Sequence, residues 1–417
     1  MEKFIINGGY RLTGEICIQG AKNSVLPILA ATIISGKIST ISNIPNLRDV
    51  DMMVKILLSL GAKVDVGEGI ISIDSSTIDK IALPEEFVRE MRSSIIIMGA
   101  MLARFGEVRI AFPGGCEIGP RPIDLHLKSL RQMGAIIDEG HGFLDCKTTG
   151  LKGCEIQLDY PSVGATENIM LAAVTADGTT TIRNAAREPE IIDLQNYLNE
   201  SGAKIMGAGS SIIIIEGVNS LNSCNHRIIP DRIVAGTFMT AAAITKGEVI
   251  IKDIITDHLL SIIAKLKEAG VIIYANGTSL KIIGTNKLYS LEMLQTLPYP
   301  GFPTDMQAQF MTLLTIANGT SVVNETIFEN RFKHAEELTR MGANIKTFGK
   351  VAVIKGVKEL TGAKVFAKDL RGGAALVLAG LVAQGTTEIE NIYHINRGYD
   401  KMDISLRSLG ADIRMVE

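Results

Sequence analysis

Apolar and polar residues along the chain follow a pattern of short helices and strands that repeats six times. In each copy a glycine ends an apolar, helix-periodic stretch and precedes β-branched residues, as in Leu60-Gly61-Ala62-Lys63-Val64. This pattern is typical of a helix that ends at a left-handed glycine and leads into a strand. The phrase recurs about every 70 residues, at Gly61, Gly134, Gly202, Gly270, Gly342 and Gly410.

A second glycine recurs in step with the first. It follows an Ala/Ile/Leu-rich stretch and precedes a short strand-like one such as 179–182 or 248–251, and its copies are Gly36, Gly106, Gly178, Gly247, Gly319 and Gly385. Together the two phrases predict six units of about 70 residues, each reading strand–helix–strand–helix–strand–strand. Solenoid repeats typically span roughly 20–45 residues, so this longer unit favours compact domains over a solenoid.

Two of the predicted first helices, within 169–176 and 374–383, are apolar on nearly every side. Such helices are expected to be buried, with sheets packed outside them. We therefore predict an α/β protein of two domains, each made of three βαβαββ units. Residues 22–229 are expected to form the first domain. Residues 1–21 and 230–417 are expected to form the second, because the first 20 residues resemble the closing strands of a unit.

Composition narrows the class of protein. The 417 residues include 42 Lys+Arg and 45 Asp+Glu, 46% are apolar, and there is no Trp. The net charge of -3 argues against nucleic acid or an anionic membrane as the main ligand, and the apolar content argues against disorder. The longest apolar runs are well short of the roughly 20 residues that span a bilayer. No secretory signal is visible at the N-terminus.

The cysteines form no CxxC pair and are odd in number: Cys17, Cys116, Cys146, Cys154 and Cys224. This usage favours reduced thiols in a cytoplasmic protein over a disulfide frame or a zinc site. We expect Cys17 and three others to be small buried residues. Cys116 differs, because it lies in a Gly- and Pro-rich loop beside Arg121, where positive charge favours the thiolate. We therefore expect a chemical role for Cys116.

Polar clusters mark the predicted start of the first helix in every unit, at 22–24, 92–94, 162–164, 231–232, 304–305 and 369–373. Capping by Ser, Thr and Asp explains part of this pattern, but capping does not require Lys22, Arg92 or Arg371. Helix N-termini favour anions, and Arg binds phosphate or carboxylate at two points. Because further arginines precede the second helices (Arg121, Arg187, Arg331, Arg397), we predict a site for anionic groups. Asp305 is a candidate general base for a hydroxyl.

These motifs resemble the UDP-N-acetylglucosamine 1-carboxyvinyltransferase family, the enolpyruvyl transferases that open bacterial peptidoglycan synthesis. They span the chain: Lys22-Asn23, 113–126, 162–166, 186–190, 303–305 and 370–373. The resemblance implies two inside-out α/β barrels of three units each, with the active site in the cleft between the domains. It also implies the substrates UDP-N-acetylglucosamine and phosphoenolpyruvate, and alkylation of the cysteine by fosfomycin. No cofactor, metal, nucleic acid, membrane or obligate protein partner is implied.

The resemblance assigns roles residue by residue. Cys116 matches the acid that protonates the methylene carbon of phosphoenolpyruvate, and Asp305 matches the base that deprotonates the sugar 3'-hydroxyl. Lys22, Arg121 and Arg397 match the clamp on phosphate and carboxylate, with Asn23 at the reacting centre. The nucleotide-sugar contacts match Arg92, Arg121, Pro122, Ile123, Asp124, Leu125, Ser162, Val163, Gly164 and Ile327, and Asp369 and Arg371 match the wall of the second domain. Tyr160 departs from the pattern, because many members have lysine there.

Two alternatives stay open. The shikimate-pathway enolpyruvyl transferase resembles this chain in architecture, but it uses no cysteine at the loop position that Cys116 occupies. A non-enzymatic ring of repeats around nucleic acid belongs to a different class. The net charge of -3 argues against the ring.

Overall fold

The structure, a computed structural model, describes residues 2–113 and 123–416, and these residues fall into two compact units. The terminal unit combines the stretch up to Gln19 with the residues from Pro230 onward. The middle unit comprises the described residues between Gly20 and Ile229. Each unit has its own hydrophobic core.

The middle unit contains three small sheets, of which two are mixed and one is antiparallel. Its strands are β3 (Ile38–Ser42), β4 (Lys63–Gly67), β5 (Ile70–Asp74), β6 (Glu107–Ala111), β7 (Ile136–Gly140), β8 (Phe143–Lys147), β9 (Glu155–Gln157), β10 (Thr179–Arg183), β11 (Lys204–Met206), β12 (Ile212–Glu216) and β13 (Asn225–Arg227). The sheet orders are β13-β3-β5-β4, β6-β8-β7 and β11-β12-β10-β9. In each four-stranded sheet one edge strand, β13 or β9, pairs in parallel with its neighbour, and the other pairs are antiparallel.

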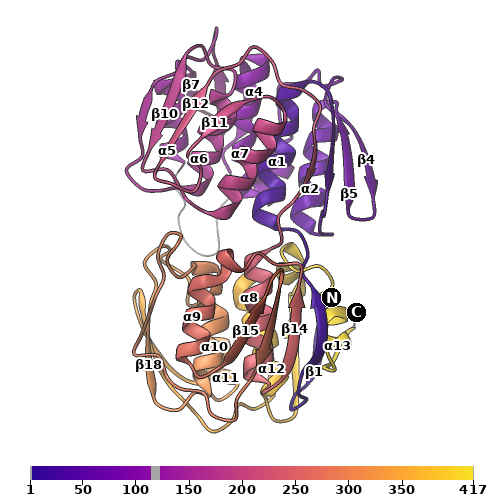
Figure 1. Cartoon of the computed structure of the whole chain (residues 1–417), viewed down its shortest axis with the longest axis vertical. Coiled ribbons are helices and arrows are strands. Elements are labelled where there is room, and N and C mark those ends of the chain that lie inside the picture. Colours follow the sequence, from indigo (N-terminus) through magenta and orange to yellow (C-terminus); the bar gives the residue numbers. More distant parts are fainter. Residues whose placement is uncertain (1, 114–122, 417) are drawn as a thin grey trace. The chain divides into compact units, whose positions relative to one another are not determined.

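The terminal unit repeats this arrangement. Its strands are β1 (Lys3–Asn7), β2 (Thr13–Cys17), β14 (Glu248–Lys252), β15 (Ile272–Asn276), β16 (Ser279–Ile283), β17 (Met293–Gln295), β18 (Thr320–Asn324), β19 (Asn344–Phe348), β20 (Val351–Lys355), β21 (Lys364–Phe366), β22 (Thr386–Glu390) and β23 (Asp412–Val416). The sheet orders are β15-β16-β14-β2, β17-β18-β20-β19 and β21-β22-β1-β23. Strand β1, indigo among yellow segments in Figure 1, is antiparallel to both β22 and β23, so the N-terminal strand completes the last repeat.

The first helix of each repeat is buried and packs against its counterparts in the same unit. These inner helices are α1 (Lys22–Ser35), α4 (Ile97–Phe105) and α6 (Val163–Ala173) in the middle unit, and α8 (Arg232–Ile244), α10 (Gln307–Thr315) and α12 (Leu370–Val382) in the terminal unit. Two of them begin with a 3-10 turn, η1 (Arg92–Ile96) before α4 and η3 (Thr304–Met306) before α10. Every residue of α8 is buried. The expected burial of the first helices is confirmed.

The remaining helices bury only one face. They are α2 (Arg48–Leu60), α3 (Glu85–Glu90), α5 (Asp124–Gln132), α7 (Pro189–Glu200), α9 (Leu260–Glu268), α11 (Lys333–Arg340) and α13 (Met402–Ser408), with 3-10 turns η2 (Thr256–Leu259) and η4 (Ile392–Arg397). The buried apolar residues of α2 follow the helical period, at Val50, Met53, Ile56, Leu57 and Leu60. No helix in the described ranges is long and apolar enough to cross a membrane.

The repeated glycines adopt the predicted left-handed conformation with one exception. The six glycines of the first phrase have φ between 91° at Gly270 and 105° at Gly61. In the second phrase the left-handed residue of the fourth copy is Lys246, with φ 56°, and not Gly247. A Cβ on Gly247 would lie 2.3 Å from the Leu12 carbonyl oxygen, so glycine is needed there for close approach of the chain.

The order of elements confirms the predicted fold class. Residues 155–216 run β9, α6, β10, α7, β11 and β12, which is the βαβαββ order. Sheets surround buried helices in both units, as Figure 1 shows for each unit separately. This arrangement brings the starts of the inner helices, which carry the predicted site residues, into defined positions within each unit.

Candidate active site

Asp305 lies in η3, at the start of the second inner helix of the terminal unit. Its Oδ1 accepts a hydrogen bond from Arg331 Nη2 at 2.7 Å, and its Oδ2 accepts one from Arg371 Nη2 at 2.9 Å. The two arginine side chains are only 4% exposed, whereas that of Asp305 is 27% exposed. Two guanidinium groups favour the ionised carboxylate, which is the form that can accept a proton.

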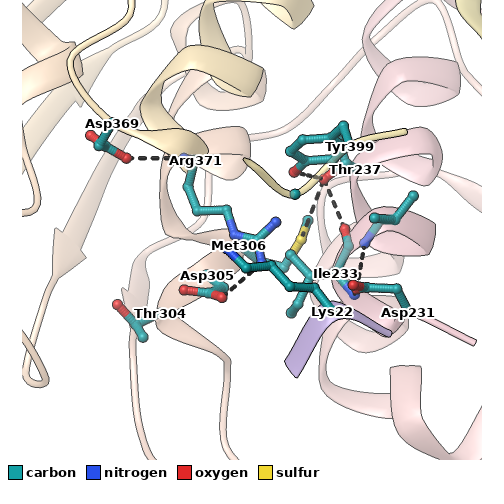
Figure 2. A network of polar contacts seen from close by, with 12 residues as sticks. Lys22, Asp231, Ile233, Thr237, Thr304, Asp305, Met306, Asp369, Arg371 and Tyr399 are labelled. Carbon is teal, nitrogen blue, oxygen red and sulfur yellow. Dashed lines mark hydrogen bonds and ion pairs between the residues drawn. The ribbon is translucent and has the colours of Figure 1, made fainter. Parts of the chain in front are cut away.

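Arg371 is fixed in place from both ends. Asp369 caps α12 and accepts hydrogen bonds from the backbone N–H groups of its first turn, including that of Arg371 at 3.0 Å. The guanidinium lies 5.6 Å from the ring centroid of Tyr399. Burial by itself lowers the pKa of Arg371, but Asp305 and Tyr399 outweigh burial and raise it above its ordinary value. Figure 2 shows Arg371 between these groups.

The arginine pair keeps hydrogen-bond donors that no described residue uses. Nε and Nη1 of Arg371 and Nε of Arg331 are buried without a partner among the described residues. Unpaired buried donors are costly, so such groups normally have a partner. Guanidinium donors in this state can bind the oxygens of a carboxylate or phosphate.

A neutral network connects the inner helices beside this cluster. Thr237 Oγ1 of α8 lies 2.8 Å from the hydroxyl of Tyr399, as Figure 2 shows. Gln309 Nε2 of α10 donates to Thr237 Oγ1 at 3.1 Å and to the Tyr399 hydroxyl at 3.3 Å. The starts of α8, α10 and α12 therefore share one polar region within the terminal unit.

Two further predicted residues of the terminal unit lie in loops or turns. Arg397 ends η4 and is half-buried, two positions before Tyr399. Ile327 is half-buried in the loop after β18, and its N–H donates to Glu325 Oε1 at 2.8 Å.

In the middle unit, Lys22 and Asn23 form the first turn of α1. Lys22 Nζ lies 2.7 Å from Oδ2 of Asp49, which sits in the first turn of α2, and both side chains are nearly buried. Asn23 is exposed. Asp49 therefore holds the Lys22 ammonium group in place. Removing either partner would leave a buried charge without its counter-charge, which is strongly destabilising.

The predicted nucleotide-sugar segments of the middle unit come together around His126. The pKa of this buried imidazole is lowered to about 4 by burial and then by the charge of Arg92. Asn168 Nδ2 lies 3.0 Å from His126 Nδ1. With the amide as donor, this bond places the proton of the neutral ring on Nε2. A Cβ on Gly164 would lie 3.2 Å from His126 Cε1, so the start of α6 packs directly on this ring.

Other predicted residues of this region have ordinary structural roles as well. Ile123 and Leu125 are half-buried and Asp124 is exposed where α5 begins. Ser162 caps α6 by accepting a hydrogen bond from the Ala165 N–H at 3.3 Å, and Val163 follows it. Capping therefore accounts for Ser162, as it does for Asp231 and Asp369, but α1, which Lys22 begins, has no side-chain cap.

Three predicted residues, Cys116, Arg121 and Pro122, lie outside the described residues. Among the other cysteines, the expected burial of Cys17 was wrong: it is exposed on β2, because Ile16 and Ile18 on either side point into the core. Cys146 and Cys224 are buried. Burial raises the pKa of Cys146 to about 12 and also raises that of Cys224, which disfavours the reactive thiolate at both.

Three residues that hold the candidate site, Asp49, Glu325 and Arg331, carry little or no local signal in the sequence. Arg331 was expected only as one of several loop arginines, and Asp49 and Glu325 were not anticipated. The recurrence of arginine before the second helices was the one signal that pointed to Arg331. Among the described residues, no group of three or more His, Cys, Asp and Glu could hold a metal ion.

Comparison with known proteins identifies the family. Residues 6–404 match the EPSP synthase (3-phosphoshikimate 1-carboxyvinyltransferase) family. UDP-N-acetylglucosamine 1-carboxyvinyltransferase 2 of Caldanaerobacter subterraneus subsp. tengcongensis is 55% identical over 413 residues, which cover 99% of both chains. UDP-N-acetylglucosamine 1-carboxyvinyltransferase 1 of Carboxydothermus hydrogenoformans is 52% identical over 416 residues, 100% of this chain and 99% of the relative.

Solved structures agree on the fold. The enolpyruvyl transferase NikO from Streptomyces tendae superposes with a TM-score of 0.91 at 25% identity, covering 100% of this chain and 99% of that one. EPSP synthase from Acinetobacter baumannii gives a TM-score of 0.77 at 18% identity, with both chains fully covered. These matches confirm the predicted inside-out barrel fold of repeated units. The chain belongs to the EPSP synthase family and, within it, to the UDP-N-acetylglucosamine 1-carboxyvinyltransferases.

Proposed function

We propose that this chain transfers the enolpyruvyl group of phosphoenolpyruvate to the 3'-hydroxyl of UDP-N-acetylglucosamine and releases phosphate. This reaction is the first committed step of peptidoglycan synthesis. The observation that carries the proposal is the 55% identity to a curated enzyme of this name over 99% of both chains. The reduced thiols and the family's nucleotide-sugar substrate favour a cytoplasmic location.

The proposed reaction is an addition followed by an elimination. In the addition, a base takes the proton of the sugar hydroxyl, the oxygen attacks C2 of phosphoenolpyruvate, and an acid delivers a proton to C3. The product is a tetrahedral ketal that still carries the phosphate group. In the elimination, a proton leaves the new methyl group, the bond from C2 to the phosphate oxygen breaks, and phosphate departs. No electrons are exchanged with a cofactor in either step.

Asp305 is the proposed base. Its contacts with Arg331 and Arg371 at 2.7 and 2.9 Å favour the ionised state that a base requires. The unpaired donors of the two buried arginines support binding of an anionic group beside it. A hydroxyl held next to Asp305 would therefore meet both a proton acceptor and an adjacent anionic reactant.

The other proposed catalytic groups come from both parts of the chain. Cys116 is the proposed acid at C3, and Lys22, Arg121 and Arg397 are the proposed clamp on the anionic groups, with Asn23 at the reacting centre. Cations placed where negative charge must be held stabilise the transition state electrostatically. We further propose that residues 22–229 and residues 1–21 with 230–417 are the two domains.

The nucleotide sugar is proposed to contact Arg92, Arg121 to Leu125, Ser162 to Gly164 and Ile327, with Asp369 and Arg371 nearby. The neutral imidazole of His126 supports this assignment, because it adds a hydrogen-bonding ring beside Gly164 without adding charge. Tyr160, 43% exposed, is the position where contacts to the nucleotide should differ from those of relatives that have lysine.

A phosphate-release assay tests the function. Purified protein is mixed with phosphoenolpyruvate and UDP-N-acetylglucosamine, with shikimate 3-phosphate as the control acceptor. We expect phosphate only with the nucleotide sugar, and without any added metal or cofactor. Release with shikimate 3-phosphate alone would support the shikimate-pathway alternative instead.

A further inference from the structure

We propose that Glu325 is a positioning residue that locks the turn of Asp305 to the loop of Ile327. The proposal rests on the proposed function, in which Asp305 is the base and Ile327 contacts the nucleotide sugar. Glu325 follows β18 directly, and it is 1% exposed.

Glu325 accepts four hydrogen bonds through its two carboxylate oxygens. Oε1 accepts from Thr296 Oγ1 at 2.9 Å and from the backbone N–H groups of Ile327 and Phe328 at 2.8 and 3.2 Å. Oε2 accepts from Thr304 Oγ1 at 2.9 Å. All four donors are neutral groups, and they bind both oxygens of the carboxylate. Hydrogen bonds therefore stabilise this buried side chain without a counter-charge among these four partners.

These bonds connect three separate segments of the terminal unit. Thr296 follows β17, Thr304 begins η3, and Ile327 lies in the loop after β18. Thr296 and Thr326 add two more bonds to the connection, at 2.9 and 2.6 Å. Glu325 is the group through which the turn of η3 and the Ile327 loop are joined.

The chemistry of the side chain explains why a carboxylate is needed. A buried charge is costly unless its hydrogen-bonding capacity is used, and an apolar side chain of similar size packs at lower cost. A glutamine offers only one accepting atom, so it cannot accept from both sides. Glu325 therefore favours one defined geometry of the turn and the loop more than it favours stability of the fold.

The same loop also holds Asp305 through a second residue, Arg331. Thr304 is adjacent to Asp305, and Figure 2 shows the two next to each other. Arg331, a few residues after Glu325, binds Asp305 Oδ1 at 2.7 Å and reaches the Thr304 carbonyl oxygen at 3.5 Å. Glu325 therefore holds the turn through the Thr304 hydroxyl, and Arg331 holds it through the Asp305 carboxylate. A misplacement of about 1 Å can lower the rate of a catalytic step by roughly 100-fold.

The test uses Thr304→Val, because replacing Glu325 itself would remove the acceptor of four donors at once and disturb both segments together. Valine keeps the shape of threonine and removes only the bond to Oε2, while Thr304→Ser keeps the hydroxyl. Thr312→Val is the matched control, since it removes a buried hydroxyl of α10 that bonds to the Ala308 and Ala375 carbonyls. Turnover, the KM for UDP-N-acetylglucosamine and hydrogen exchange at 304–306 and 327–328 are measured for all variants.

We expect Thr304→Val to lower kcat roughly tenfold or more, with a much smaller change in KM because Oε1 still holds the Ile327 N–H. Thr304→Ser should restore most of the turnover, and Thr312→Val should lose stability without losing turnover. Hydrogen exchange should rise in Thr304→Val only, most at 304–306 and less at 327–328, where Oε1 still accepts from the two backbone N–H groups. Full turnover in Thr304→Val, or equal loss in Thr312→Val, would overturn the proposal.

The two proposals fail in different ways. If the unaltered chain releases no phosphate, the proposed function fails, and hydrogen exchange alone then decides the role of Glu325. Exchange in Thr304→Val that matches the unaltered chain at both segments would overturn the role of Glu325, whatever the activity is.

Discussion

At the scale of single residues, the site depends on charges held by buried partners. Asp305 is bound by Arg331 and Arg371, and Lys22 is bound by Asp49. Each contact fixes the charged end of a lysine or arginine, whose long flexible side chain would otherwise be mobile. Asp305 and Lys22 are therefore held in place by partners within the chain itself, which lowers the cost of reaching a reactive geometry at these two candidate groups.

Asp305→Asn should lower kcat by roughly 10²–10⁴-fold, because the amide keeps the shape but cannot take the hydroxyl proton. Phosphate release under saturating substrates measures the effect. Asp257→Asn, an exposed substitution of the same kind in η2, is the control and should leave turnover unchanged. Normal turnover in Asp305→Asn would remove Asp305 from the role of base.

Cys116→Ser should abolish most activity and prevent alkylation by fosfomycin, because a serine hydroxyl is a far weaker acid and nucleophile than a thiol. Cys17→Ser is the matched control: Cys17 is exposed on β2, whereas burial raises the pKa of Cys146 to about 12. Peptide mass spectrometry locates the adduct. A fosfomycin adduct on Cys17 in place of Cys116 would contradict the assignment.

Residue types and repeat positions predicted which side chains belong to the candidate site, but not which partners hold them. Asp305 and Arg371 were expected from their places at helix starts, and the structure shows them in direct contact. The bond from Arg331 depends on how the loop after β18 folds back on η3, which no local pattern encodes. Cys17 was mispredicted for a different reason: strand alternation places it on the face of Glu15, and the neighbouring Ile16 and Ile18 occupy the buried face.

At the scale of elements, the inner helices approach one another so closely that glycine is required. A Cβ on Gly99 of α4 would lie 2.2 Å from the backbone oxygen of Asn168 and 2.6 Å from its Oδ1. The Gly99 N–H also donates to that Oδ1 at 2.6 Å. This contact sets the spacing between α4 and α6, and with it the position of His126, which bonds to Asn168.

Gly99→Ala should destabilise the middle unit by about 1–3 kcal/mol or more, because backbone atoms must move to admit the methyl group. The unfolding temperature should fall by about 2–4 °C per kcal/mol. Gly140→Ala, at a position with no atom within 4 Å, is the control and should change little. Equal stability of the two variants would show that the contact between α4 and α6 can widen without a measurable cost, and that glycine is not required at position 99.

His226 on β13 gives the middle unit a pH-dependent contact. Its Nε2 lies 2.9 Å from Asp193 Oδ1 and its Nδ1 lies 2.8 Å from Glu200 Oε2. Both bonds require a proton on each nitrogen, and so the charged ring. Burial alone lowers the pKa of His226, but Asp193 and Glu200 raise it above its ordinary value. Asp193 also bonds to Ser24 of α1, the helix that begins at Lys22.

The raised folded-state pKa means that His226 contributes its full stability below the unfolded value of about 6.5. That contribution is lost as the pH rises through the folded-state value. The urea unfolding free energies of the unaltered chain and of His226→Gln should therefore differ most at about pH 6 and least at about pH 9. A difference that grows with pH would contradict the charged ring.

The ends of the helices could be predicted from the sequence, whereas the pairing of strands that lie far apart in the sequence could not. Glycine at 61, 134 and the equivalent positions marks helix ends by its backbone freedom alone. The parallel pairing of β13 with β3 joins the last strand of the middle unit to its first sheet. That pairing depends on closure of the whole unit, so the alternation within 225–227 did not reveal it.

At the scale of the whole molecule, the chain forms two equivalent sets of three repeats, and its N-terminal strands belong to the second set. Strand β1 completes the sheet of β22 and β23, and β2 pairs in parallel with β14. The N-terminal stretch thus belongs to the terminal unit, and the middle unit is inserted after Gln19. The six repeated phrases predicted six units, and the two separate hydrophobic cores show that these units pack in two sets of three.

Identification of the reaction product tests the central claim most directly. The chain is incubated with phosphoenolpyruvate and UDP-N-acetylglucosamine, and the nucleotide sugar is analysed by mass spectrometry and NMR. We predict a product in which an enolpyruvyl group replaces the hydrogen of the 3'-hydroxyl, formed in equal amount with phosphate. An unchanged nucleotide sugar, or an enolpyruvyl group at another hydroxyl, would contradict the account.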